Sequence, residues 1–352
     1  MRRLPIFLVL DVSESMAGTN RDQLEEGIGT IVATLRTDAQ ALDTVYLSVI
    51  AFAGIARTLV DLCELPAFRA PPLPIGGGTA LGAALDLVMD EIDRQVIIGD
   101  RSRKGDWRPI VYLFTDGKPT DDISAARERW LSHYRARVDL VAIALGDYAD
   151  QAVLATLTDH ILAFDPSVPG GFEVFMRWLT ESVSLQSQRL GETEGGRKLS
   201  LAKVDERIIV QADPDDLHAP HADADCVVMI GRCQRNAQPY LLKYDRHKGD
   251  SINTEYLKIP VEGYRISGAY PLNETYFEWS QPGASGGQAN TADLEGAAAC
   301  PCCGNPITIA LCRCGHLFCI TGPGRADCPW CGSEVEFQGG GVEDFSVERG
   351  QG

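Results

Sequence analysis

Apolar positions follow two different spacings along residues 1–190. Continuous apolar runs of strand length predict buried strands at Ile6–Leu10, Val45–Phe52, Ile110–Phe114, Val138–Leu145 and Ile161–Phe164. Between these runs, apolar residues at helical spacing predict helices over 24–35, 81–92, 123–135 and 172–185. Strands that are buried on both faces and separated by helices predict an α/β fold, with a doubly wound, mostly parallel sheet and right-handed crossovers.

The pattern changes after residue 190. Polar, glycine-containing residues over 186–200 predict a linker. Short β-type runs split by turn residues predict a small β-rich unit over 200–280; the runs are Arg207–Gln211, Cys226–Ile230, Tyr240–Tyr244, Tyr256–Ile259 and Thr275–Trp279. We expect a flexible linker at 281–297, a cysteine-rich module at 298–337 and a disordered tail at 338–352.

Composition narrows the class of protein. Hydrophobic residues make up 45% of the chain and charged residues 23%, which are ordinary globular values. The formal net charge of −17 argues against binding to nucleic acid or to an anionic membrane. No apolar run approaches the ~20 residues that a bilayer requires. The first apolar stretch ends at Asp11 without a signal-peptide cleavage site, so we expect a cytoplasmic protein.

Oxygen-bearing side chains follow the predicted strands. Asp11, Ser13 and Ser15 come directly after the first strand, and alternate residues of an extended segment face the same way. Thr79 opens a predicted helix after three glycines that permit close backbone approach, and Asp116 ends a later strand. Ligand sites of open α/β sheets lie at this edge. Such hard oxygen ligands suit Mg²⁺, Mn²⁺ or Ca²⁺ and disfavour zinc.

The residue types at this site favour binding over catalysis. Two carboxylates supply little charge, so an open coordination position would attract an acidic residue of a partner protein. A metal-dependent phosphatase at Asp11 is the alternative, but the acid–base carboxylate usual two residues later is Ser13 here. No histidine or lysine is evidently placed as a general base, and we therefore expect no enzymatic activity.

These five positions, in this order on a βα framework, resemble the metal-ion-dependent adhesion site of the von Willebrand factor type A domain. The resemblance covers about residues 1–190. It implies a doubly wound sheet and divalent-metal-dependent ligand binding. In that family pattern Ser13, Ser15 and Thr79 would coordinate the ion directly, and Asp11 and Asp116 largely through water.

A second metal signal comes from cysteine. Eight of the eleven cysteines lie between Cys300 and Cys331, which in a cytosolic protein indicates metal rather than disulfides. Seven of them with one histidine give eight ligands, enough for two closed structural zinc sites, although a single site is the alternative and the pairing is open. The predicted ligands are Cys300, Cys303, Cys312, Cys314, His316, Cys319, Cys328 and Cys331. Cys302 is left over, while Cys63, Cys226 and Cys233 are expected to be buried and inert.

The spacing from Cys314 to Cys331 resembles the RING and treble-clef group, which makes a ubiquitin-ligase-type scaffold an alternative function. A RING would need another ligand near Gly322, and none is present. The combination of both modules resembles the bacterial TerY group, which is associated with tellurite resistance and stress and carries a C-terminal zinc-binding domain. That resemblance implies a metal-dependent adaptor for a Ser/Thr kinase and a PP2C-like phosphatase. The metal ion would bind an acidic residue of the partner protein.

Overall fold

The chain forms two compact units. The computed structural model describes residues 2–99, 102, 104–115, 118–145, 149–164, 171–192, 199, 201–203, 209–211, 226–248, 252–253, 258–259, 262–281, 286–338 and 345–350. The first unit comprises Met1–Val12, Thr19–Pro74 and Thr79–Pro220, and the second comprises Ser13–Gly18, Ile75–Gly78 and His221–Gly352. Two short segments from the N-terminal half of the sequence therefore belong to the second unit.

The first unit contains a seven-stranded sheet in the order β3-β2-β1-β4-β5-β6-β7. Its strands are β1 (Leu4–Asp11), β2 (Val45–Phe52), β3 (Ala56–Glu64), β4 (Ile110–Thr115), β5 (Asp139–Leu145), β6 (Ile161–Phe164) and β7 (Ile209–Gln211). The five central strands pair in parallel, and β3 and β7 pair antiparallel at the two edges. The predicted α/β fold with a mostly parallel sheet is confirmed.

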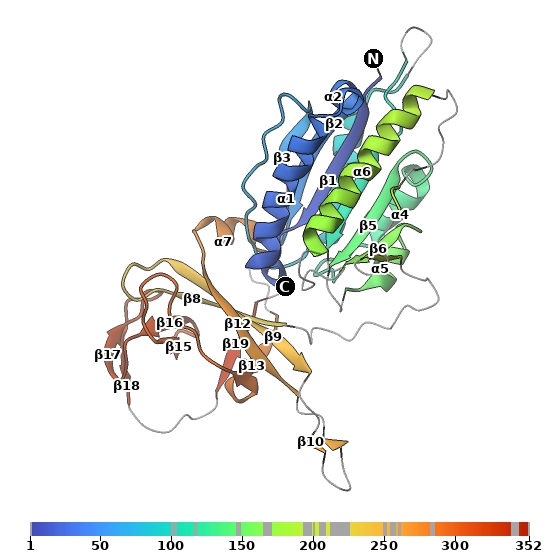
Figure 1. Cartoon of the computed structure of the whole chain (residues 1–352). Coiled ribbons are helices and arrows are strands. Elements are labelled where there is room, and N and C mark those ends of the chain that lie inside the picture. The colour runs from blue at the N-terminus through green and yellow to red at the C-terminus, as the bar shows by residue number, and fades with distance from the viewer. Residues whose placement is uncertain are drawn as a thin grey trace. The chain divides into compact units, whose positions relative to one another are not determined.

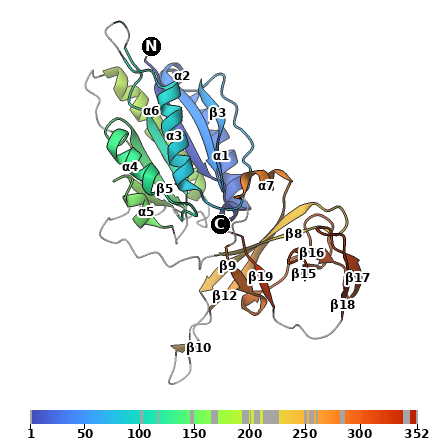
Figure 2. The same cartoon turned by 180° about the vertical axis from the view of Figure 1, so that it is seen from behind.

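Helices cover both faces of this sheet. They are α1 (Thr19–Leu35), α2 (Ala39–Thr44), α3 (Leu81–Gln95), α4 (Ser124–His133), α5 (Gln151–Ala155) and α6 (Gly171–Glu192). Figure 1 shows α1 and α6 over one face, and Figure 2 shows α3 and α4 over the other. Coverage on both faces explains why the central strands are continuous apolar runs rather than alternating ones.

The second unit is built around a six-stranded sheet in the order β14-β12-β9-β8-β16-β15. These strands are β8 (Cys226–Arg232), β9 (Pro239–Lys248), β12 (Glu262–Pro271), β14 (Leu294–Glu295), β15 (Ile307–Leu311) and β16 (Leu317–Ile320). The smaller pairs are β10 (Ile252–Asn253) with β11 (Lys258–Ile259), β13 (Gln288–Asn290) with β19 (Ser346–Glu348), and β17 (Gly324–Asp327) with β18 (Glu334–Phe337). Short helices are η1 (Glu14–Met16), α7 (Thr275–Trp279) and η3 (Thr291–Asp293).

The structure joins segments that the sequence pattern separates. β16, from the predicted cysteine-rich module, pairs in parallel with β8, from the predicted β-rich unit, so both belong to one sheet. β13 lies in the predicted linker and pairs with β19, which lies in the predicted disordered tail. Ile209–Gln211, from the first predicted run of the β-rich unit, instead pairs with β6 in the first unit.

One predicted strand is a helix. Thr275–Trp279 forms α7, so the prediction of β structure there was wrong. The side chain of Asn273 accepts hydrogen bonds from the backbone N–H (3.1 Å) and the hydroxyl of Thr275. An asparagine that bonds to the backbone two residues later starts a turn, and here this local bond directs the chain into a helix.

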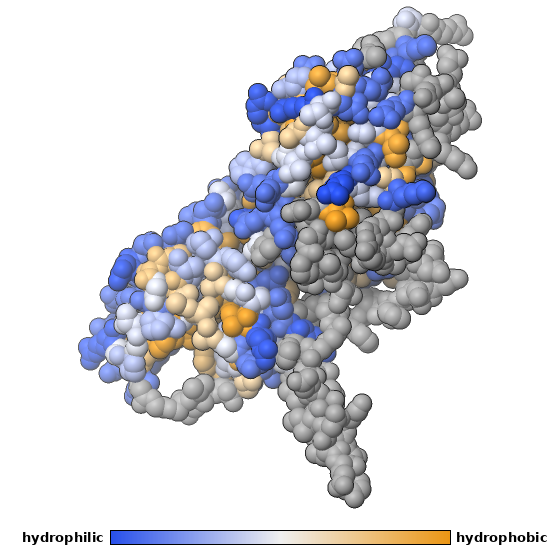
Figure 3. Space-filling model, viewed as in Figure 1, coloured by the Kyte–Doolittle hydropathy of each residue, from blue (hydrophilic) through white to orange (hydrophobic). Residues whose placement is uncertain are grey.

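Polar surface and apolar interior are separated in both units. On the face drawn in Figure 3, the described surface mixes large hydrophilic areas with smaller hydrophobic ones. Among the described residues, no helix combines the length and apolar character needed to cross a membrane.

The hydrophobic core of the first unit includes one large indole. Trp130 of α4 is 1% exposed and packs with residues such as Val111, Leu140 and Leu157. Its indole N–H donates a 3.1 Å hydrogen bond to the carbonyl of Leu157. The side chain therefore contributes both buried apolar area and a satisfied polar group.

We expect Trp130→Ala to lower the free energy of unfolding by about 3–5 kcal/mol, because it leaves a large cavity and an unpaired carbonyl. Urea denaturation followed by circular dichroism measures the change. The neighbouring Leu131 is 39% exposed, and Leu131→Ala is the matched control with a much smaller effect. Equal losses for the two variants would contradict the assignment of Trp130 to the core.

Candidate metal centres

The first predicted ligand stands at the end of an apolar strand. Asp11 is the last residue of β1, and its carboxylate is fully buried. The hydroxyl of Thr115, at the end of the neighbouring strand β4, donates a 2.7 Å hydrogen bond to Asp11 Oδ2. Burying a carboxylate is costly unless hydrogen bonds or a cation compensate for the lost water. The buried Asp11 carboxylate is therefore a candidate ligand for a cation at the end of β1.

Two hydroxyls follow in the next loop. Ser13 is buried, and its Oγ lies 2.9 Å from the Oγ of Ser15. Backbone hydrogen bonds from Met16 to Ser13 (3.0 Å) and from Ala17 to Glu14 (3.0 Å) close the short helix η1. The prediction placed the two serines in an extended segment, whereas Ser15 lies in this short helix and Ser13 directly precedes it.

Thr79 is held just before helix α3. It is buried, and its backbone N–H donates to the hydroxyl of Thr120 (2.9 Å) while its carbonyl accepts from the Thr120 N–H (2.9 Å). Asp121 accepts from the N–H groups of Gly82 (3.1 Å) and Ala83 (3.0 Å) in the first turn of α3. These bonds satisfy helix donors that would otherwise lack partners, and they fix the backbone at Thr79.

Of the five predicted adhesion-site residues, four are described. Asp116 lies outside the described residues, immediately after β4 ends at Thr115. The other four supply one carboxylate and three hydroxyls, which is a donor set for a hard divalent cation. Their joint coordination of an ion stays a prediction.

Eight cysteines converge in two groups of four. The first group is Cys233, Cys300, Cys303 and Cys319; the second is Cys312, Cys314, Cys328 and Cys331. Within each group the sulfur atoms all lie within 4.8 Å of one another. The separations are 3.6 Å for Cys303–Cys319, 3.7 Å for Cys312–Cys331 and 3.8 Å for Cys314–Cys328. A tetrahedral zinc ion with Zn–S bonds near 2.3 Å places its sulfur ligands about 3.8 Å apart, so both groups fit zinc.

Tight turns present these thiols. The N–H of Gly304 donates to the Cys300 carbonyl (2.8 Å), and the N–H of Gly332 donates to the Cys328 carbonyl (2.9 Å). Both glycines have positive φ, 81° and 73°, which other residues adopt only with strain. This is why a glycine directly follows each of the two Cys-x2-Cys pairs.

Cys233 is a ligand candidate that the sequence prediction missed. It starts the same kind of turn, in which the N–H of Ala237 donates to the Cys233 carbonyl (2.8 Å). Ala237 has a φ of 58°, and among the described non-glycine residues it alone has a positive φ. Asn236 stands where the second cysteine of a Cys-x2-Cys pair would be. This turn therefore presents only one thiol. Because the sequence has no Cys-x2-Cys pair here, the spacing of cysteines does not identify Cys233 as a ligand.

The structure places His316 outside both groups, which corrects the predicted ligand set. Its ring stacks on Trp330 with centroids 4.5 Å apart, and its Nδ1 lies 3.1 Å from the Cys314 carbonyl oxygen. Cys233 takes the place that the sequence assigned to this histidine. The eight candidate ligands are therefore all thiols.

Hydrogen bonds reach sulfur atoms in both groups. Cys319 Sγ accepts from the backbone N–H of Gln234 (3.3 Å) and from the side chain of Asn305 (3.4 Å). Burial nevertheless raises the pKa of the Cys319 thiol. Hydrogen bonds from the hydroxyl and backbone of Ser333 lower the pKa of Cys331 to about 6. A bound cation would favour the thiolate form of these side chains, because a coordinating thiol is deprotonated.

Two family models match the chain. Residues 6–118 match the von Willebrand factor type A domain, and residues 223–352 match the TerY-C metal binding domain. None of the curated proteins matches it.

Solved structures give only distant likenesses. Proximal thread matrix protein 1 from the mussel byssus is 14% identical with a TM-score of 0.38, covering 52% of this chain and 48% of its own. The chain thus spans about half the length of that protein. The ArnB paralog VWA2 from Sulfolobus acidocaldarius is 13% identical with a TM-score of 0.37, covering 99% of this chain and 66% of its own. At these TM-scores the structural likeness adds nothing to the family matches.

We expect Cys233→Ser to reduce bound zinc from two ions to about one per chain, because it removes one of four thiols from the first group. His316→Ala should leave two ions bound. Mass spectrometry of the metal in the purified full-length chain measures both. Cys226→Ser is the control, because Cys226 lies outside both groups. Loss of zinc from His316→Ala but not from Cys233→Ser would restore the ligand set predicted from sequence.

Proposed function

We propose that this chain, which combines a von Willebrand factor type A domain with a TerY-C metal binding domain, is a non-enzymatic adaptor that binds protein partners through a divalent cation. The observation that carries the proposal is the set of oxygen donors: Asp11 ends β1, Ser13 precedes η1, Ser15 lies within η1, and Thr79 stands just before α3. A buried carboxylate beside hydroxyls offers an ion few negative charges, so the bound ion keeps a net positive charge.

The residues fit a magnesium-type ion. Asp11, Ser13, Ser15 and Thr79 would hold it, with Asp116 as the fifth ligand that the family resemblance implies. When bound, the cation supplies an open coordination position for an acidic side chain of the partner. The role of the chain is to keep its donors fixed: Thr115 orients the Asp11 carboxylate, and Thr120 and Asp121 hold the backbone at Thr79.

The same donor types support binding rather than catalysis. A phosphatase with an aspartyl nucleophile usually carries its acid–base carboxylate two residues later, and this chain has Ser13 there. Ser13 is buried and its hydroxyl lies next to that of Ser15, so it is suited to coordinate an ion and not to transfer a proton.

The cysteine groups have a structural part in this proposal. Four thiols close a tetrahedral zinc site and leave no open position for a substrate. The partners are a Ser/Thr kinase and a PP2C-like phosphatase of a cytoplasmic tellurite-resistance or stress-response system, which is the setting implied by the resemblance to the TerY group. The acidic residue that coordinates the ion belongs to one of these partners.

We expect Asp11→Ala to abolish Mg²⁺-dependent partner binding while the protein stays folded, because the ion loses its buried carboxylate. Affinity capture from a lysate of the native cell, with and without added Mg²⁺, followed by mass spectrometry, measures this. Mg²⁺ should be omitted rather than chelated with EDTA, because EDTA also removes zinc.

Asp43→Ala is the matched control, since Asp43 is an exposed aspartate of α2 in the same unit. Recovery of a kinase or phosphatase by wild type and Asp43→Ala in Mg²⁺, and its loss with Asp11→Ala, supports the proposal. Equal recovery of the same partners by Asp11→Ala, or in the absence of Mg²⁺, would refute the metal-dependent mechanism.

A further inference from the structure

We propose that helix α7 positions the loop carrying Ser13 and Ser15, and that the second cysteine group holds α7 in place for this purpose. Zinc bound by the second cysteine group then influences how tightly the site with Ser13 and Ser15 binds its divalent cation. The inference rests on the proposed function, because it concerns the regulation of the same cation site. Every residue that carries it, from Ser13–Gly18, Ile75–Gly78 and His221–Gly352, belongs to the second compact unit.

The glycines before Thr79 show what approaches their backbone. A Cβ at Gly76 would lie 2.6 Å from the Cβ of Trp279 and 2.7 Å from its carbonyl oxygen. A Cβ at Gly77 would lie 3.0 Å from the Tyr276 hydroxyl. The Gly77 N–H donates to the Ser280 hydroxyl (2.7 Å), and its carbonyl accepts from the N–H of Gln281 (3.2 Å). The absence of side chains here thus makes room for α7 and the residues directly after it.

The loop with the two serines is held by the same region. The hydroxyl of Tyr276 donates to the carboxylate of Glu14, which stands between Ser13 and Ser15 and is fully buried. Burial raises the pKa of Tyr276, so its hydroxyl stays protonated and remains a donor. The ammonium group of Lys243 donates to the carbonyl of Ser15 (2.7 Å). These contacts hold the backbone of the loop and the side chain that stands between the two serines.

Apolar packing reinforces these bonds. Ala17 from the loop and Ile75, next to Gly76, form one buried cluster with Leu241, Leu272 and Tyr276. The hydrogen bonds orient the loop, and the apolar cluster excludes water that would compete for these bonds. Tyr276 belongs to both the cluster and the hydrogen bond to Glu14, so it is the central positioning residue.

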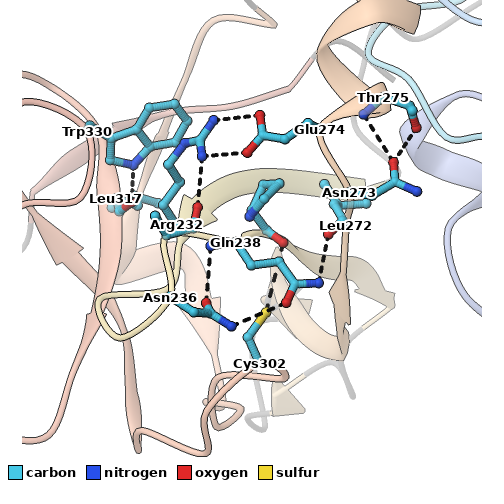
Figure 4. A network of polar contacts seen from close by, with 12 residues as sticks. Arg232, Asn236, Gln238, Leu272, Asn273, Glu274, Thr275, Cys302, Leu317 and Trp330 are labelled. Atoms are coloured by element: carbon cyan, nitrogen blue, oxygen red, sulfur yellow. Dashed lines mark hydrogen bonds and ion pairs between the residues drawn. The ribbon is translucent and has the colours of Figure 1, made fainter.

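Phe277 of α7 contacts Trp330, a residue of the turn that carries two thiols of the second cysteine group. Trp330 lies between Cys328 and Cys331, and its ring meets that of Phe277 edge-on with centroids 6.1 Å apart. The guanidinium of Arg232 lies 4.6 Å from the Trp330 ring centroid and 5.1 Å from that of Phe277. It also forms two hydrogen bonds with the Glu274 carboxylate, of 2.7 Å and 2.9 Å. Figure 4 shows Arg232 reaching both Glu274 and the indole of Trp330.

The path from zinc to the loop is therefore short. It runs from the Cys328–Cys331 turn through Trp330 and Phe277 to Tyr276, the neighbour of Phe277 in α7, and on to Glu14. A helix of five residues is too short to be stable alone, so α7 depends on what it docks against. Cys328 and Cys331 would hold a zinc ion at this turn, and the bound ion would fix Trp330 between them, because a bound ion contributes directly to local folding.

The test measures Mn²⁺ affinity of the full-length, zinc-loaded chain by isothermal titration calorimetry. Trp330→Ala and Tyr276→Phe should each keep two zinc ions per chain and weaken Mn²⁺ binding by about tenfold, a common size for coupling between sites. Cys331→Ser should lower zinc to about one ion per chain and weaken Mn²⁺ binding as much. Ile307→Ala is the control, because Ile307 is 39% exposed and lies in β15 of the same unit.

Tyr276→Phe keeps the aromatic ring and removes only the hydroxyl, so its effect does not depend on loss of folding. Wild-type Mn²⁺ affinity in both Trp330→Ala and Tyr276→Phe would overturn the inference. Asp11→Ala separates this failure from that of the proposed function. If Asp11→Ala binds Mn²⁺ as wild type does, the cation site itself is misassigned and both proposals fail; if it loses Mn²⁺ while the α7 variants do not, only the coupling fails.

Discussion

The convergence of thiols is the interaction on which the second unit depends. Cys233 and Cys319 lie inside one of its hydrophobic clusters, together with Tyr240 and Leu317, and Cys328 lies inside another. Sulfur atoms gathered at the centre of a small core must either stay protonated or share a cation. A zinc ion bound to four of these thiols would replace that cost with four ligand bonds. The strands and α7 are arranged around these two centres.

The sequence predicted the first unit well because its central strands are buried on both faces. Such strands appear as unbroken apolar runs, and helices with one apolar side separate them. β3 was not predicted, because an edge strand that is half-exposed tolerates Arg57 and Asp61 among its apolar residues. α7 was misassigned because its aromatic residues favour strands by propensity, whereas the turn at Asn273 and packing against Trp330 decide for a helix.

The candidate sites were predictable where their ligands are close in sequence. The end of β1 and the loop after it carry one carboxylate and two hydroxyls within five residues, and the Cys-x2-Cys pairs are equally local. Cys233 was missed because it stands far from the other cysteines in a turn with one thiol. His316 was misassigned because its spacing to Cys314 and Cys319 is that of a ligand, and only the stacking on Trp330 shows where its ring lies. Long-range pairing of ligands is a property of the fold, which local spacing does not encode.

The order of the ligands along the chain has a consequence for biosynthesis. The two groups interleave, since Cys312 and Cys314 of the second lie between Cys303 and Cys319 of the first. A chain made from its N-terminus exposes Cys233 as a lone thiol, and a long loop must close before this residue meets Cys300. The first group is complete once Cys319 has emerged, whereas the second waits for Cys331. Metal loading of the nascent protein therefore has a direction, and the centre that contacts α7 is the last to form.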